Sequence, residues 1–439
     1  MPTRPLDNEL TVTSSETTTA PAAEIQANIS SPEKQSRKIT VTLAFLSGCI
    51  ALIMTGFGII IPVFPQRLES LGLGAETLAL MEVGFGLGMF LFSPVLGTLA
   101  DRIGRKPVVL LSLAGFILTN LVLAVVNVPL LFILVRFIEG VVASGMLPAA
   151  TAMVGDSIPP ERQGRWLGMI TTAQASGVAL GPAIGGFLYQ VWGFITPFLL
   201  SAAIALAASL LALFMLKETL PAHVRAQAQQ RRADRQEQRG RRIFAVDLAA
   251  LNRSRILQLF GLLLFFDFSV AFAYPFVLPE YPFFFEKVLH YTSAQYGTIV
   301  SVYGLSLAVF PMFLGRLSEL APKKLLIALG CLLIPVLNIG MLFLHQFALL
   351  IAATVVTGLG SALFMPALSV VYLGKTTEQN RSQVMGIRGS ALSLAILLGP
   401  LALALFSRWL TPHATFAIAA AIPLLVLLLI PLLSVKRSG

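Results

Sequence analysis

Charged residues are scarce in this chain of 439 residues: only 12% are Asp, Glu, Lys or Arg, whereas 56% are hydrophobic. The mean hydropathy is +0.83. A soluble domain of this length does not need so much apolar surface, so the composition excludes an ordinary soluble protein. The sequence therefore indicates a protein whose helices are surrounded by lipid.

Cysteine and histidine are also scarce, with two and four residues respectively. Cys49 and Cys331 lie inside apolar segments, which favours packing residues over a disulfide or a metal pair. The histidines show no metal-ligand spacing, and no catalytic constellation or glycine-rich nucleotide loop stands out. We therefore expect no metal, no cofactor, no enzymatic activity and no ATP drive.

Long apolar runs fill most of the chain. About 20 apolar residues are enough to cross a bilayer as a helix. Twelve such runs occur, at 41–64, 77–98, 107–127, 129–153, 166–190, 194–216, 256–279, 293–315, 324–344, 347–371, 385–407 and 413–434. Residues 1–37 lack the pattern of a signal peptide, and we expect them to form a disordered cytoplasmic tail.

Basic residues concentrate on one side of this arrangement. If both termini are cytoplasmic, the opposite side carries only Arg67, Lys287 and Arg408. This asymmetry is typical of the positive-inside rule and predicts a multi-pass protein of the cell membrane with cytoplasmic termini. The net charge of +10 then indicates contact with anionic lipid headgroups, and no nucleic-acid partner is expected.

The two halves of the chain repeat each other at an offset of 218 residues. The offset aligns Asp101 with Glu319, and Gly181-Pro182 with Gly399-Pro400. We therefore expect two similar six-helix bundles, at 38–216 and 256–439, which is typical of a rocking transporter. The basic segment 217–255 between them is either a helix on the membrane surface or a solvated linker.

A tight turn with glycines and charges joins the second and third runs. Its notable residues are Gly97, Asp101, Arg102, Gly104, Arg105 and Lys106. This segment resembles the loop signature of the major facilitator superfamily, and the resemblance covers residues 40–435. In that family the loop stabilises one facing state through contacts between the halves, so the resemblance implies a conformational latch that includes Glu319 in the second copy.

The fourth run contains Arg136 and Glu139. An arginine inside a membrane helix costs about 2.5–3.5 kcal/mol, so it must face protein or water. Residues three apart share a helix face, so the two side chains can neutralise each other. The superfamily pattern usually has Gln in place of Glu139. The pair is either responsive to protons or a fixed structural ion pair.

Small residues at intervals of four mark the fifth run, which contains Gly177, Gly181, Pro182, Gly185 and Gly186. Such a stripe lets another helix pack at backbone distance. With the Gly-Pro step it resembles the antiporter motif of the twelve-helix drug:proton antiporters. The resemblance implies export in exchange for protons and a bendable helix between the halves.

Two further acids, Glu82 and Asp267, lie inside apolar runs. Each must be neutral, paired or cavity-facing, so each is either a candidate for proton coupling or an acid satisfied by a nearby hydroxyl or backbone group. Aromatic residues surround Asp267 and suit a pocket for lipophilic or cationic compounds, although part of the run fits an interfacial belt. The cavity candidates are Phe57, Phe265, Phe266 and Tyr274.

The sequence thus predicts an all-α, twelve-span membrane transporter of the major facilitator type, acting as a monomer. We expect proton-coupled export of small lipophilic or cationic compounds by alternating access. The main alternative is an exporter dedicated to one metabolite, lipid or glycolipid. A proton-coupled importer and a membrane receptor are less favoured.

Overall fold

The computed structural model describes residues 32–158, 160–220, 253–376 and 381–433. Within these ranges the regular elements are all helices. The predicted tail up to residue 31 and most of the predicted basic linker, residues 221–252, lie outside the described residues. Residues 32–37, assigned above to the tail, are instead the first residues of a helix.

Six helical segments form the first half of the chain. Two of these segments are divided into two helices. One break contains Pro62, which cannot donate a backbone hydrogen bond, and the other contains the Ser144-Gly145 pair. The elements are α2 (Pro32–Ile60) with α3 (Phe64–Ser70), α4 (Ala75–Ile103), α5 (Arg105–Val125), α6 (Pro129–Ala143) with α7 (Met146–Ser157), α8 (Pro160–Trp192) and α9 (Ile195–Met215).

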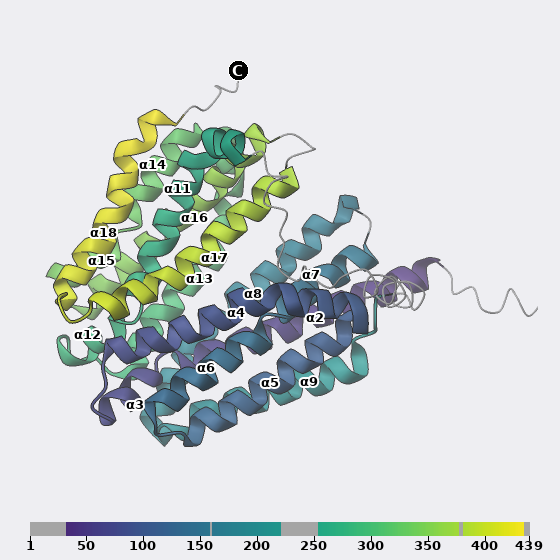
Figure 1. Cartoon of the computed structure of the whole chain (residues 1–439), viewed down its shortest axis with the longest axis horizontal. Helices are drawn as coiled ribbons and strands as arrows, with labels where there is room; N and C mark the ends of the chain where they lie inside the picture. Colours follow the sequence, from purple (N-terminus) through teal and green to yellow (C-terminus); the bar gives the residue numbers. More distant parts are fainter. Residues whose placement is uncertain (1–31, 159, 221–252, 377–380, 434–439) are drawn as a thin grey trace, which may run out of the picture.

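The second half repeats this arrangement, including a break in its first segment. The elements are α11 (Arg253–Val277) with α12 (Tyr281–Lys287), α13 (Ser293–Leu320), α14 (Lys323–Leu333) with α15 (Val336–Phe343), α16 (Phe347–Lys375), α17 (Arg381–Phe406) and α18 (Pro412–Leu429) with the short η1 (Ile430–Leu432). Among the described residues the helices thus group into twelve segments. The predicted fold of two six-helix bundles is confirmed (Figure 1).

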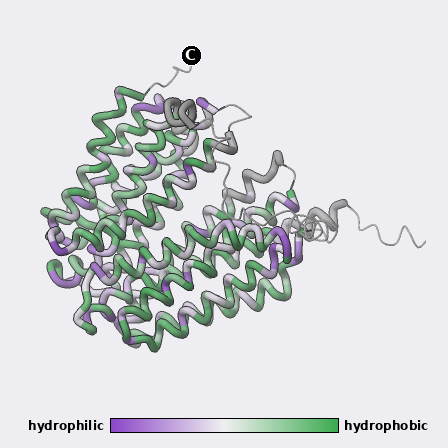
Figure 2. The backbone as a smooth tube through the Cα atoms, in the orientation of Figure 1, coloured by the Kyte–Doolittle hydropathy of each residue, from purple (hydrophilic) through white to green (hydrophobic). Residues whose placement is uncertain are grey.

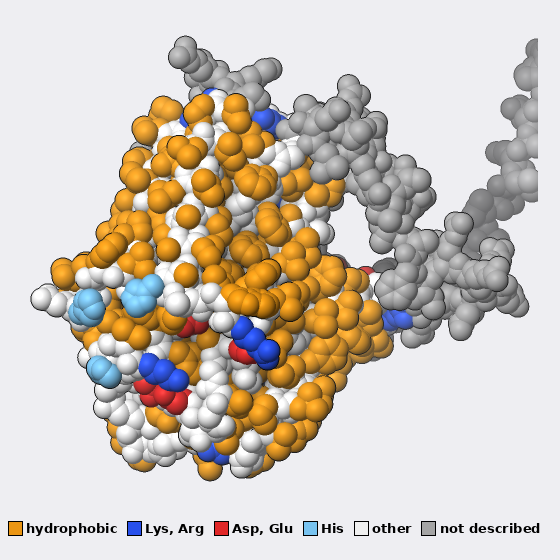
Figure 3. All heavy atoms as spheres, turned by 60° about the vertical axis from the view of Figure 1, so that its left-hand side comes forward, with side chains coloured by type: hydrophobic (Ala, Val, Ile, Leu, Met, Phe, Trp, Pro, Cys, Tyr) orange, Lys and Arg blue, Asp and Glu red, His pale blue; other side chains and the backbone are white. Residues whose placement is uncertain are grey.

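The outer surface of both bundles is apolar. Large side chains such as Phe214 and Phe313 expose 80% and 77% of their area. Hydrophobic residues run along the helices and hydrophilic ones gather near the helix ends (Figure 2). On the face shown in Figure 3, charged side chains gather where the end with α3 and α12 comes forward. In the described residues, ten segments are long and apolar enough to cross a membrane. The protein is therefore a multi-pass membrane protein.

The glycine stripe of α8 packs against α2 of the same bundle. A Cβ at Gly177 would lie 2.6 Å from the carbonyl oxygen of Ala51, and one at Gly181 would lie 2.5 Å from that of Thr55. A Cβ at Gly185 would likewise clash with the carbonyl oxygen of Ile59. Helix backbones can approach this closely only where side chains are absent.

The other face of α8 packs against α13 of the second bundle. Gly186 contacts the backbone of Ser293, and Gly297 contacts the backbone of Pro182. The amide of Ala183 donates to the hydroxyl of Ser301 at 2.9 Å. The stripe and the Gly-Pro step thus serve two interfaces, one within the first bundle and one between the bundles.

The two bundles meet at the end that carries α3 and α12, and their helices diverge toward the other end (Figure 1). At the α3–α12 end, Gln66 donates to the hydroxyl of Ser293. Lys287 lies 3.5 Å from the carboxylate of Glu69. Among the described residues, the hydrogen bonds and ion pairs between the bundles lie in this half of the molecule. The α3–α12 end is therefore closed.

We predict that Gly181→Ala destabilises the protein by about 1–3 kcal/mol, because the added methyl group forces α8 away from α2. Gly168→Ala on the same helix is the matched control. A Cβ there meets nothing within 4 Å, so only the gain in helix propensity, up to about 1 kcal/mol, remains. Thermal unfolding of the purified variants in detergent measures both. Equal unfolding midpoints would contradict the packing assignment.

Candidate functional site

A buried cluster of three charges lies in the first bundle. Arg136 on α6 donates from Nη1 to Oε2 of Glu139 at 2.9 Å and from Nη2 to Oε1 of Glu82 on α4 at 2.7 Å. The side chains of Arg136 and Glu139 are 4% and 0% exposed, whereas that of Glu82 is 25% exposed. The structure thus brings together three of the four residues predicted for proton coupling, with two carboxylates on one guanidinium.

Aromatic rings enclose this charge cluster. The guanidinium carbon of Arg136 lies 4.6 Å from the ring centre of Phe85 and 5.4 Å from that of Phe57. A ring face attracts a cation, and the attraction strengthens where water is excluded. One oxygen of Glu139, Oε1, is buried and has no hydrogen-bond partner among the described residues. Arg136 is therefore enclosed by rings and carboxylates, but one carboxylate oxygen of the cluster lacks a hydrogen-bond partner.

A small cavity of about 70 Å³ connects the cluster to the second bundle. Glu82, Arg136 and Phe57 line it from the first bundle. Leu278 and Tyr296 are among the residues that line it from the second bundle. Glu82 therefore faces the space between the bundles, whereas Glu139 lies behind Arg136 and does not line this cavity.

Asp267, the fourth residue predicted for proton coupling, belongs to a separate ion pair in the second bundle. Arg388 on α17 donates from Nε and Nη2 to the two oxygens of Asp267 on α11, at 2.8 and 3.2 Å. Its third nitrogen donates to Ser369 at 2.9 Å, and its guanidinium carbon lies 4.9 Å from the ring centre of Tyr372. In this ion pair the charge of one carboxylate is balanced by the charge of one guanidinium.

The charge cluster and the ion pair lie at opposite depths. Glu82 and Arg136 are each seven residues from the starts of α4 and α6, which lie at the α3–α12 end. Arg388 is seven residues from the start of α17, which lies at the opposite end. Seven residues of helix span about 10 Å. The two sets of charges are therefore on different sides of the bilayer centre.

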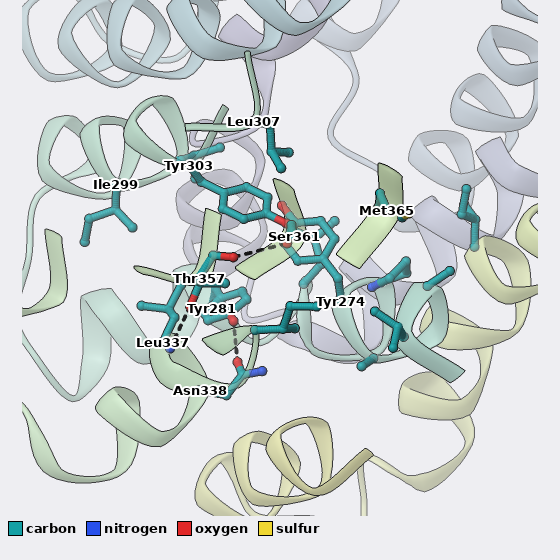
Figure 4. Close-up of a pocket in the computed structure, with 18 of the residues that line it drawn as sticks. Tyr274, Tyr281, Ile299, Tyr303, Leu307, Leu337, Asn338, Thr357, Ser361 and Met365 are labelled. Carbon is teal, nitrogen blue, oxygen red and sulfur yellow. Dashed lines mark hydrogen bonds between the residues drawn. The ribbon is translucent and has the colours of Figure 1, made fainter. Parts of the chain in front are cut away.

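A larger pocket of about 350 Å³ lies within the second bundle (Figure 4). Tyr274, predicted as a cavity residue, lines it and stacks on Tyr303 with ring centres 5.4 Å apart. Tyr281 donates to the side-chain oxygen of Asn338. The neighbouring predicted residue Phe266 is fully buried in the apolar core, and Phe265 is 49% exposed, so neither lines this pocket.

The loop between α4 and α5 is held within the first bundle. Arg105 forms ion pairs with Asp101 and, at 3.2 Å, with Asp156. The carboxylate of Glu218 accepts hydrogen bonds from the backbone amides of Arg105 and Lys106 at 3.0 and 3.2 Å, which caps the start of α5. Arg102 lies in the last turn of α4.

The glycines of the predicted latch, the exposure of Asp101 and the equivalent residue Glu319 in the second half complete the description. Gly104 has φ +112, which favours glycine, and Gly97 has nothing within 4 Å of an added Cβ. Asp101 remains 62% exposed. The side chain of Glu319 lies outside the described residues. The described contacts of the predicted latch are thus made within one bundle, at the end where the bundles diverge.

Two functional candidates were missed by the sequence reasoning, Arg388 and Glu218. Arg388 is a single cation inside an apolar run, and that exception alone could have marked it as the partner of a buried acid. Glu218 directly follows the sixth run, and nothing local in the sequence connects it to the start of α5, because the contact spans 113 residues.

Comparison with protein families identifies the relatives of this chain. The model of the Major Facilitator Superfamily matches residues 46–285 and 259–438. The chain is 26% identical to Multidrug resistance protein 2 of Bacillus subtilis over 362 residues, which covers 82% of this chain and 87% of that protein. It is 29% identical over 378 residues to the class E tetracycline resistance protein of Escherichia coli, covering 83% and 87%.

Solved structures share the fold. The crystal structure of a bacterial homolog of the human lysosomal transporter Spinster, in an inward-facing and unoccupied conformation, matches with a TM-score of 0.65 at 14% identity. The match covers 92% of this chain and 95% of that one. At this identity the likeness shows the arrangement of the helices.

We predict that Arg388→Gln destabilises the protein by about 3–5 kcal/mol, because it leaves the buried Asp267 carboxylate without its partner. Adding Asp267→Asn restores more than half of the loss, because the uncompensated charge is removed. Unfolding of the single and double variants measures this coupling. Arg408→Gln, at an exposed position, is the control for loss of a surface cation. A double variant no more stable than Arg388→Gln would contradict the assignment.

Proposed function

We propose that this chain, which belongs to the Major Facilitator Superfamily, exports small lipophilic or cationic compounds in exchange for protons. The chain matches the relatives that carry the names multidrug resistance and tetracycline resistance over more than four fifths of its length. That similarity supports drug efflux as the class of activity. The observation that carries proton coupling is the buried cluster of Arg136 with two carboxylates.

The net charge of the cluster favours the binding of one proton. With Glu82 and Glu139 both ionised, its net charge is −1, and an uncompensated charge buried among apolar helices is unfavourable. One added proton makes the cluster neutral and leaves Arg136 paired with a single carboxylate. Glu82 faces the cavity between the bundles and exchanges the proton, while Glu139 keeps Arg136 in place behind it.

Asp267 differs from the cluster because its charge is already balanced. Arg388 meets both of its oxygens, and a bidentate pair of this kind is among the strongest hydrogen-bonded contacts in proteins. A proton on Asp267 would weaken the contact with Arg388 and leave the buried guanidinium without a counter-charge. We therefore assign the transported proton first to Glu82 and Glu139, and we treat Asp267 as the second candidate.

The closed α3–α12 end fits one state of an alternating-access cycle. The positive-inside rule places this end outside the cell, because the opposite end carries the basic loop of Arg102, Arg105 and Lys106. In the proposed cycle this state opens toward the cytoplasm, where substrate binds and the proton leaves. Opening of the α3–α12 end then releases the substrate outside and lets a new proton reach Glu82.

The proton gradient is sufficient for this exchange. One proton that moves inward across 100 mV gains about 2.3 kcal/mol. A tenfold substrate gradient requires about 1.4 kcal/mol. A single proton per cycle can thus maintain more than a tenfold gradient of a neutral substrate.

We predict that Glu82→Gln and Glu139→Gln each reduce substrate-dependent proton movement at least tenfold, because the cluster loses its unbalanced charge. The protein is reconstituted into liposomes with a pH-sensitive dye inside, and ethidium, tetracycline or acridone is added. Glu76→Gln, in the first turn of α4, is the control for loss of an acid from the same helix. Asp267→Asn is measured alongside.

Normal coupling in both glutamate variants would disprove the cluster as the proton site. If Asp267→Asn alone abolishes coupling, the proton belongs to the ion pair of the second bundle. Competition among the three unrelated compounds distinguishes broad efflux from an exporter dedicated to one solute, since a dedicated exporter would show no mutual inhibition.

A further inference from the structure

The aromatic pocket of the second bundle occupies the place that the charge cluster occupies in the first. The offset of 218 residues that relates the two halves aligns Glu82 with Val300, Arg136 with Thr354 and Glu139 with Thr357. Val300 and Thr357 line the pocket of about 350 Å³. The duplicated site therefore has charges in one copy and open space in the other.

The hydroxyl groups that replace the charges are satisfied by the helices themselves. Thr354 donates to the carbonyl of Leu350 at 2.7 Å, and Thr357 accepts from the amide of Leu337 at 2.9 Å. These short side chains take up less volume than Arg and Glu, and they need no counter-charge. The second copy of the site consequently holds a cavity about five times the volume of the 70 Å³ cavity beside the cluster.

The walls of this pocket are aromatic and uncharged. Four tyrosines line it, together with Asn338 and Ser361, and none of its lining residues is Asp, Glu, Lys, Arg or His. Tyr274 and Tyr303 stack with an angle of 23° between their rings (Figure 4). The pocket thus offers flat apolar surfaces with a few hydroxyl and amide groups at their edges.

This chemistry selects against a charged ligand. A cation that enters the pocket loses its water and meets no carboxylate in the walls, and the faces of the tyrosine rings compensate only part of that loss. A flat uncharged ring system loses little hydration and gains contact with the aromatic walls. A carbonyl or N–H group on its edge can bond to the hydroxyl and amide groups of the pocket.

We propose that this pocket binds the uncharged lipophilic part of the proposed substrate range, namely flat aromatic compounds that carry a hydrogen-bonding edge, so that one copy of the duplicated site handles the proton and the other these substrates. The transport of such a compound rests on the function proposed above, whereas its binding does not. Tyr296 and Leu278 line both the pocket and the small cavity beside Glu82. They form a shared wall through which an occupied pocket can act on the charge cluster.

The test compares two probes of the same shape and different charge. Acridone is a flat neutral tricycle with one carbonyl and one N–H group, and N-methylacridinium is a flat tricycle with a permanent positive charge. Both are fluorescent, so equilibrium binding to the full chain in lipid nanodiscs is measured by polarisation. We expect acridone to bind at least tenfold more tightly than N-methylacridinium.

Val300→Glu transfers the acid of the first copy into the second. We expect it to weaken acridone at least fivefold and to strengthen N-methylacridinium at least fivefold. Val300→Gln is the matched control, because Gln has nearly the shape of Glu but no charge. We expect this variant to keep its preference for acridone. Equal effects of the two substitutions, or tighter binding of the cation by the unmodified protein, would overturn the proposal.

A second pair of variants tests the location without adding charge. Tyr303→Leu removes a stacked wall of the pocket and is expected to weaken acridone at least tenfold. Tyr291→Leu removes a tyrosine of the same bundle that does not line the pocket and leaves binding unchanged. Thermal unfolding verifies that each variant is folded. Unchanged acridone binding in folded Tyr303→Leu overturns the site.

The same measurement in Glu82→Gln and Glu139→Gln distinguishes this proposal from the proposed function. Acridone binding that persists in these variants while proton movement is lost supports both. Persistent binding with normal proton movement removes only the proton site. If the unmodified protein does not prefer acridone over N-methylacridinium but still moves protons, only the proposed pocket is disproved.

Discussion

Arg136 is 3% exposed, and a guanidinium can be kept at that depth only where carboxylates lie beside it. Glu82 and Glu139 do so at 2.7 and 2.9 Å. Much of the site follows from this requirement. It fixes the positions of α4 and α6 relative to each other, because one carboxylate comes from each helix. With both carboxylates ionised, the cluster also carries more negative than positive charge, which the balanced pair of Asp267 and Arg388 avoids.

The duplication explains how the two halves could perform the different tasks proposed for them. A transporter with the same charged site in both bundles would have two buried clusters to neutralise and little room between its helices. Replacing Arg and Glu by Thr354 and Thr357 removes that electrostatic cost and opens a pocket in the second bundle. The fold tolerates the replacement because each threonine bonds to its own or a neighbouring helix.

The sequence predicts the contacts that are local or periodic. The pairing of Arg136 with Glu139 follows from helical spacing, and the close packing of α8 follows from its stripe of glycines. The partner of that stripe, α2, is not encoded in the spacing. The contacts from Arg136 to Glu82 and from Arg388 to Asp267 join residues 54 and 121 positions apart, and only the folded bundle brings them together.

Aromatic density also has limits as a guide to cavities. Adjacent residues on a helix point in directions about 100° apart, so Phe265 and Phe266 cannot share one environment. The structure buries Phe266 in the core and leaves Phe265 half exposed. Tyr274 reaches the pocket because α11 presents that face to α13, where Tyr303 stacks on it. The composition of a run thus indicates an aromatic site, and the position of each ring must come from the packing.

The small cavity beside Glu82 links the charge cluster to the relative position of the bundles. Its walls belong to both halves: Glu82 and Arg136 come from the first, and Leu278 and Tyr296 from the second. In the closed α3–α12 end these apolar and aromatic side chains lie between the bundles beside the carboxylate, which is 25% exposed. In the proposed cycle the bundles rotate to open that end, the wall from the second half moves away from Glu82, and the carboxylate gains access to the solution on that side. In that proposed cycle a single motion changes both the access to the acid and the access to the pocket, so no separate device is needed to couple them.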